Sequence, residues 1–96
     1  MSVRGDAQAK AQAWAEKLAQ EGRLYHSTLS QGLTKCWTAI GENAAAAPSV
    51  AMAEQILMND PAHRENILAT RWNAVGVGVA RGANGYYVVQ VFVTGC

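Results

Sequence analysis

The chain contains two histidines, His26 and His63, and the short sequence Gly41-Glu42-Asn43 lies between them. Two neutral imidazoles and one carboxylate suit zinc or another divalent metal, and they leave a fourth position for water or substrate. A metal-bound water of this kind is acidified and becomes a nucleophile. Without a metal, Glu42 could act as a general base or orient a histidine. The candidate site is therefore His26, Glu42 and His63, although their spacing along the chain is not diagnostic by itself.

The segment before His26 is predicted to form a helix over residues 6–21, with Asp6 as N-cap and Gly22 as a left-handed C-terminal residue. Apolar residues recur on one face at helical spacing, namely Ala7, Ala11, Trp14 and Leu18. Because this face is mostly alanine, we expect another element to pack closely against it. His26 follows the end of the helix and is expected on a loop.

A short strand is predicted over residues 36–40, directly before Glu42. A second helix is predicted to begin in the segment 44–49 and to run to about Met58. A third helix should cover residues 62–68, with Asp60 as its N-cap and Pro61 in its first position. His63 would then lie in the first turn of that helix.

From residue 73 onward the pattern changes to the period of two that is typical of strands. Valines at 75, 77 and 79 alternate with Gly76, Gly78 and Ala80, so another element should approach the bare face. A turn is predicted over residues 82–85 and a second strand over residues 86–93. Both faces of that second strand are apolar, which predicts a helical layer on each side of the sheet.

Composition and charge exclude several classes of partner. Half of the 96 residues are apolar, which predicts one small globular domain over residues 1–96. The net charge is +1 with neutral histidines and no basic stripe is present, so nucleic acid is not an expected partner. The longest apolar run is too short for a transmembrane segment. The first residues lack the apolar stretch of a secretory signal.

The two cysteines, Cys36 and Cys96, permit one disulfide. The alternative is two unrelated thiols. A disulfide would stabilise a domain of this size and would indicate an oxidising compartment.

Several motifs in order resemble the CAP superfamily of cysteine-rich secretory, antigen 5 and pathogenesis-related 1 proteins, in its bacterial SCP-like branch. They are Ala13-Trp14-Ala15, Leu24-Tyr25-His26-Ser27, Gly41-Glu42-Asn43, Pro61-Ala62-His63-Arg64-Glu65-Asn66-Ile67-Leu68, Val75-Gly76-Val77-Gly78-Val79-Ala80 and Tyr86-Tyr87-Val88-Val89-Gln90-Val91-Phe92. The resemblance covers nearly the whole chain. It implies an α+β fold, a three-layer α-β-α sandwich with a small, mainly antiparallel sheet.

The resemblance also implies a central cleft that binds a divalent metal such as Zn²⁺ in several members. Carried over residue by residue, its histidines are His26 and His63, its glutamate is Glu42, and a second acidic position falls near Asp60. The structural alternative for Asp60 is the N-cap described above. The Cys36–Cys96 pair fits patterns in secreted bacterial members, so the chain is expected to be extracellular.

Three further polar residues of the motifs are expected to support the cleft. Asn43 is expected to bridge backbone groups, and Arg64 to pair with a carboxylate. Ser27 is interpreted as a backbone hydrogen-bonding group rather than as a nucleophile beside His26.

Family domains usually carry an additional segment ahead of the helix that contains Trp14. Since this chain starts almost at that helix, we expect an exposed apolar patch there or a homodimer through it.

The leading functional hypothesis is a secreted binding module for a lipid, a cell-wall component or a protein, with a metal-capable cleft. The alternative is a zinc-dependent, peptidase-like hydrolase in which Glu42 is the base. A third hypothesis is an interaction domain whose cleft is vestigial. The residues leave open whether the protein turns over a substrate, because a family resemblance does not establish catalysis.

Overall fold

The computed structural model describes residues 2–33, 36–69 and 71–95. A four-stranded sheet forms its middle layer, built from β1 (Ser2–Val3), β2 (Trp37–Ala47), β3 (Ala74–Gly82) and β4 (Gly85–Gly95). The strand order is β1-β3-β4-β2, with β4 antiparallel to both neighbours and β1 parallel to β3. The sheet is therefore mainly antiparallel, and β2 lies at one edge.

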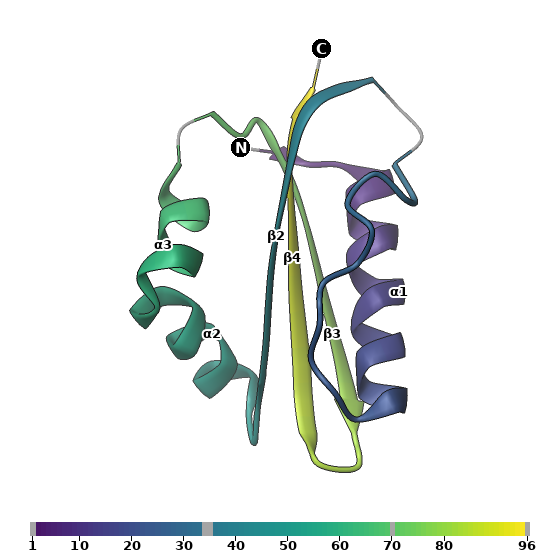
Figure 1. The fold of residues 1–96 in the computed structure, drawn as a ribbon, viewed down its shortest axis with the longest axis vertical. Coiled ribbons are helices and arrows are strands. Elements are labelled where there is room, and N and C mark those ends of the chain that lie inside the picture. Colours follow the sequence, from purple (N-terminus) through teal and green to yellow (C-terminus); the bar gives the residue numbers. More distant parts are fainter. Residues whose placement is uncertain (1, 34–35, 70, 96) are drawn as a thin grey trace.

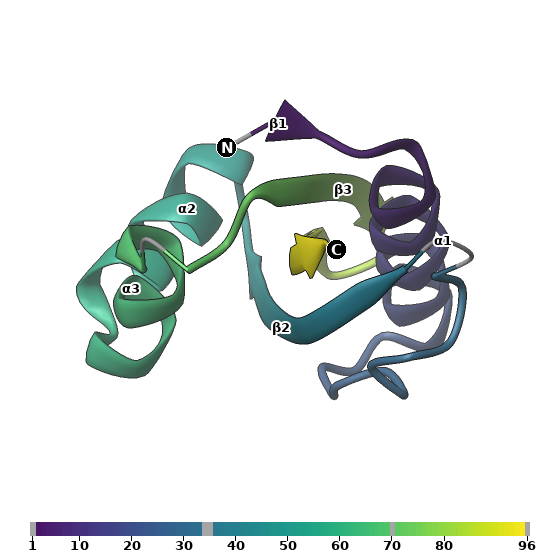
Figure 2. The ribbon, with the colours of Figure 1, turned by 90° about the horizontal axis from the view of Figure 1, so that it is seen from above.

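Helices cover both faces of this sheet. Helix α1 (Gly5–Glu21) lies on one side, and α2 (Val50–Asn59) and α3 (Pro61–Leu68) lie on the other (Figures 1 and 2). The predicted α+β fold and its three layers are confirmed. None of the helices described is long and apolar enough to cross a membrane.

Helix α1 packs unusually close to β3 because both surfaces are nearly bare. Its inner face consists of fully buried small residues and one leucine, namely Ala7, Ala11, Ala15 and Leu18. A Cβ atom added at Gly76 would lie 2.2 Å from the Ala7 carbonyl carbon, and one at Gly78 would lie 2.3 Å from that of Ala11. The expected close approach to the bare face of the strand is confirmed, and any larger residue there would push the helix away.

The two ends of α1 differ in how well they were predicted. Gly22 ends the helix in the left-handed conformation, with φ of 69°, as expected. The prediction of Asp6 as N-cap is wrong, because the helix begins at Gly5 and Arg4 is the capping residue. Asp6 instead accepts a hydrogen bond from the backbone N–H of Ala7 and pairs with the Arg4 guanidinium at 2.7 Å.

Strand β2 is much longer than predicted. It runs through Glu42 and Asn43 into the alanine segment 44–47, which was assigned to the start of a helix. Pairing with β4 from Gly95 back to Tyr86 explains the error, since this tertiary contact overrides the helical preference of alanine. Helix α2 begins only after Ser49, whose hydroxyl accepts a hydrogen bond from the Met52 N–H at 3.2 Å.

Successive residues of β2 face different halves of the core. Ile40 and Ala44 contact the α1 side, whereas Ala45 and Ala47 contact the α2 side. Because side chains alternate along a strand, Glu42 points to the α1 side and Asn43 to the α2 side. The site is therefore split between the two faces of one edge strand.

The expected exposed apolar patch on the helix that contains Trp14 is wrong. The large apolar side chains exposed in the described part of the chain all lie outside α1, namely Val3, Leu24, Leu29, Trp37, Met52, Ile56 and Leu68. Trp14 is half-buried and packs edge-to-face against Tyr25, with ring centroids 5.0 Å apart. The homodimer through this helix stays a prediction.

Candidate functional site

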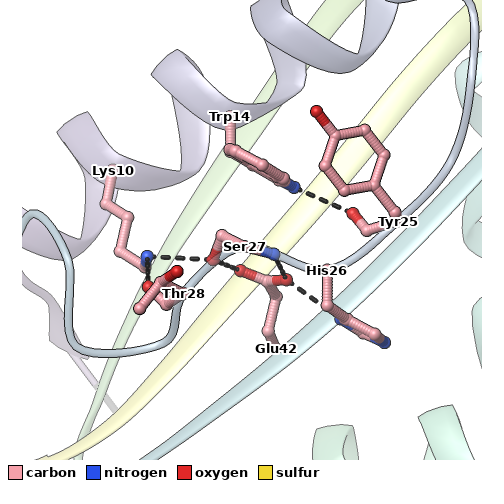
Figure 3. Close-up of polar contacts among 7 residues, drawn as sticks. All are labelled: Lys10, Trp14, Tyr25, His26, Ser27, Thr28 and Glu42. Atoms are coloured by element: carbon pink, nitrogen blue, oxygen red, sulfur yellow. Dashed lines mark hydrogen bonds and ion pairs between the residues drawn. The ribbon is translucent and has the colours of Figure 1, made fainter.

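Glu42 is a buried carboxylate in the middle of β2, and its side chain has an exposed fraction of 0%. Its Oε1 atom accepts hydrogen bonds from the backbone N–H of Ser27 at 2.9 Å and from Nδ1 of His26 at 2.9 Å. Its Oε2 atom accepts a short hydrogen bond from the Ser27 hydroxyl (Figure 3). Both oxygens are therefore engaged by two consecutive residues of the loop.

The ring of His26 is oriented by this contact. An ionised carboxylate only accepts hydrogen bonds, so the tautomer that fits this contact carries its proton on Nδ1, and in the neutral ring the lone pair is then on Nε2. The side chain is 60% exposed. The arrangement thus presents Nε2 of an oriented imidazole away from the buried carboxylate, where it can accept a proton or bind an electrophilic centre.

Lys10 supplies a positive charge on the far side of Ser27. Its Nζ atom donates to the Ser27 hydroxyl and to the Thr28 carbonyl, both at 2.9 Å, and the residue is only 8% exposed. Burial lowers the pKa of the Lys10 ammonium, and the nearby charge of Glu42 opposes that shift. A continuous hydrogen-bonded chain therefore links Lys10, Ser27, Glu42 and His26 (Figure 3).

Lys10 was not among the predicted site residues, although its position in the sequence carries a signal. Lys10 follows Ala7 by three residues and precedes Trp14 by four, so it belongs to the apolar face of α1. A charged residue on a buried face requires a partner. Nothing in the local sequence identified that partner as a serine on the following loop.

The loop that carries His26 is attached to α1 by aromatic and polar contacts. The Trp14 indole N–H donates to the Tyr25 carbonyl at 3.0 Å. Together with the edge-to-face packing of the two rings, this contact fixes the residue directly before His26 (Figure 3).

On the opposite face of β2, the fully buried Asn43 connects the strand to α3. Its side-chain amide donates to the backbone carbonyl of His63 at 3.0 Å and to the Gln90 side chain at 3.1 Å. Gln90 is also its cross-strand neighbour in β4. Asn43 thus holds the backbone of His63 while Glu42 holds the ring of His26.

The side chain of His63 is not part of the Glu42 network. Its Nδ1 lies 3.7 Å from Asp60 Oδ2, is buried, and makes no hydrogen bond within the described residues. Asp60 directly precedes Pro61, the first residue of α3. The expected carboxylate partner of Arg64 is not seen, because within the described chain the Arg64 guanidinium forms no ion pair.

Gly41 lies beside Trp72, a contact that was not predicted from the sequence. A Cβ atom at Gly41 would be 2.7 Å from the Trp72 ring, which stacks against Phe92 at 5.9 Å between centroids. The glycine before Glu42 therefore makes room for an aromatic side chain from the segment between α3 and β3.

The three predicted ligands do not form a ready metal site. Within residues 2–33, 36–69 and 71–95, no group of three or more His, Cys, Asp or Glu side chains is placed to hold a metal ion. The Glu42 oxygens already accept hydrogen bonds, and His63 faces Asp60. As placed, the residues do not fit a shell in which His26, Glu42 and His63 all bind the metal directly.

The predicted Cys36–Cys96 disulfide lies outside the described residues, since Cys96 is not among them. The neighbouring residues Trp37 and Gly95 are paired between β2 and β4.

Comparison with known proteins gave one match. The model of the CAP family, the cysteine-rich secretory protein family, matches residues 1–93. No curated protein and no solved structure matched the chain.

Proposed function

Because the chain belongs to the CAP family, we propose that it is a secreted binding module in which the exposed imidazole of His26 contacts the ligand or a divalent metal ion. Proteins of this family are generally secreted or extracellular. The observation that carries the proposal is the burial of Glu42 behind His26 and Ser27. This carboxylate orients one ring, and that ring is the exposed part of the network.

In this proposal Glu42 does not bind the metal ion itself. It orients His26, which does. A carboxylate on the second nitrogen of a histidine fixes its tautomer and increases the basicity of the nitrogen that binds metal. A bound divalent metal would supply Lewis acidity at Nε2 of His26. The ligand itself is proposed to be a lipid, a cell-wall component or a protein segment that approaches this exposed ring.

The hydrolase alternative is less well supported. It requires Glu42 to take a proton from a water molecule, but the side chain is fully buried and accepts hydrogen bonds at both oxygens. A general base must lie within hydrogen-bond reach of the proton that it removes. His26 is the better placed base, because its side chain is exposed whereas that of Glu42 is buried.

Zinc titration by calorimetry tests the metal part of the proposal. We expect wild-type protein to bind and His26→Ala to lose binding. Glu42→Gln should weaken binding by about 10- to 100-fold, as for a residue in the outer shell. Weaker zinc binding by His63→Ala would show that the second histidine also contacts the metal. Arg64→Ala, on the exposed surface of α3, is the control. Failure of the wild type to bind zinc, or equal binding by all variants, would reject a metal at His26.

Turnover is tested separately. A screen of peptides and esters, with and without a chelator, should give no turnover above that of the His26→Ala variant. Chelator-sensitive hydrolysis that disappears in this variant would favour the hydrolase alternative over the binding module.

A further inference from the structure

A hollow lies on the α1 side of the molecule, between the helix and the loop that follows it. Its volume is about 300 Å³, at the lower end of the range for small-molecule sites. Its lining consists of Lys10, Ala13, Trp14, Lys17, Ser27, Gln31 and Gly32. The hollow therefore shares Lys10 and Ser27 with the buried network, but His26 does not line it.

The loop closes this hollow by wrapping around the stem of Lys10. Gly32 has φ of 90°, and a Cβ atom there would lie 3.4 Å from Cβ of Lys10. The polar end of Lys10 reaches Ser27 and Thr28, so the lysine forms part of the wall and its charge is already compensated by hydrogen bonds and by Glu42. The hollow thus lies between α1 and the loop that packs against it.

The free charge in the hollow belongs to Lys17. Its ammonium lies 5.6 Å from the centroid of the Trp14 ring, and it forms no ion pair within the described residues. The lining contains no carboxylate. Of the nearby acidic residues, Glu16 accepts a hydrogen bond from Gln12, and Glu21 accepts one from the Tyr25 hydroxyl. One cation therefore lies beside an indole ring in a hollow whose lining residues carry no carboxylate, and the nearest network carboxylate, Glu42, lies behind Ser27.

We infer that this hollow binds a small organic anion with a flat apolar body, such as an aromatic carboxylate. The ring of the ligand would pack on Trp14 and the alkyl stem of Lys10. The carboxylate would pair with Lys17 and accept a hydrogen bond from the side-chain amide of Gln31. Neither His26 nor His63 lines the hollow, so the inference does not require a metal ion or a ligand at His26.

Benzoate is a direct probe of this inference, with neutral benzamide and flexible hexanoate as comparison compounds. In an NMR titration of the whole chain, benzoate should shift the Trp14 indole N–H and the amides of Gly32 and Ser27 in a saturable manner. Benzamide should bind about tenfold more weakly, because it lacks the charged contact. Hexanoate should also bind more weakly, because it lacks the flat ring.

Two exposed cations provide a matched pair of variants. Lys17→Gln should weaken benzoate binding by about tenfold, whereas Arg23→Gln, on the same side of the molecule but outside the hollow, should leave it unchanged. The inference is overturned by any of three results: no saturable shifts, equal binding of benzoate and either comparison compound, or equal effects of the two variants. Because His26 is not needed, this result is separable from the outcome of the zinc titration.

Discussion

Lys10 is a charged residue on the buried face of α1, where most of the other residues are alanines. Its burial is tolerated because its ammonium has two acceptors and Glu42 lies behind Ser27. A buried charge costs several kcal/mol unless it is paired and hydrogen-bonded. The cation therefore belongs to the same structural unit as Glu42, and it positions the loop residues that hold His26.

The lowered pKa of Lys10 predicts how stability depends on pH. Between the lowered pKa in the folded protein and the ordinary value of 10.5, the unfolded chain binds more protons than the folded one. The contribution of Lys10 to the free energy of unfolding should therefore rise with pH through this window. Tyr25 has the opposite effect above pH 10.0, since burial first and then its bond to Glu21 raise its pKa.

The test removes the tyrosine from both proteins compared. In a Tyr25→Phe background, urea denaturation from about pH 8.5 to 10.5 should give a pH slope that is more positive with Lys10 than with Lys10→Met. The Lys10→Met protein is expected to be less stable overall, so only the difference in slope is informative. Identical slopes would mean that the folded protein does not lower the pKa of this lysine.

At the scale of single residues, motif order was the best guide. It selected His26 and Glu42, which the structure brings into contact, but it also grouped them with His63, which faces Asp60. Sequence order does not show on which face of a strand a side chain lies. That information depends on the register of β2 with β4, which places Glu42 and Asn43 on opposite faces.

Among the secondary structure elements, α1 covers part of the free edge of β3 with two of its side chains. Strand β1 pairs with β3 only at Ala74 and Val75. Beyond that point, the side-chain amide of Gln8 bonds both the N–H and the C=O of Val77, at 2.8 and 2.7 Å. Gln12 does the same at Val79, at 3.1 and 2.9 Å. Two glutamines thus occupy edge positions where a neighbouring strand would otherwise pair.

Replacing both glutamines tests this role. Gln8→Ala/Gln12→Ala should lower the free energy of unfolding by about 2 kcal/mol, since the lost bonds are partly replaced by water. The uncovered edge of β3 should also favour pairing between two copies. Chemical denaturation and light scattering over a range of concentrations measure both effects. Gln20→Ala, on the exposed part of α1, is the control and should stay within about 0.5 kcal/mol of wild type. A double variant as stable and as monomeric as this control would contradict the proposed edge protection.

The elements predicted well from the sequence are those in which apolar residues recur at a regular spacing within the element itself. The alternating strand β3 and the helix α1 were predicted close to their observed bounds, because each repeats its period over several turns or pairs. Strand β2 was predicted too short, because four alanines carry no strand period. Their conformation is decided by pairing with residues Tyr86 to Val89 of β4, which are far along the chain and which local sequence does not show.

Across the whole molecule, distant parts of the chain meet at one end of the sheet. Trp37 pairs with Gly95, the Arg4 guanidinium donates to the Cys36 carbonyl at 3.1 Å, and the Gly95 N–H donates to Asn73 at 2.9 Å. The start of β2 and the end of β4 lie together there (Figure 1). Cys36 and Cys96 each stand one residue beyond the paired Trp37 and Gly95, so a disulfide between them would close this end of the sheet.

The disulfide hypothesis and the alternative of two unrelated thiols predict different effects of cysteine substitution on stability. A bond between Cys36 and Cys96 should contribute up to about 4 kcal/mol to the free energy of unfolding in the chain-entropy model. Cys36→Ser, Cys96→Ser and the double variant should then all lose the same stability, and each should match the reduced wild type. Thiol titration of the unreduced, denatured wild type should find no free thiol. Two reactive thiols, or losses that add in the double variant, would contradict the bond, and this end of the sheet would then be held by strand pairing and by hydrogen bonds such as those of Arg4 and Asn73.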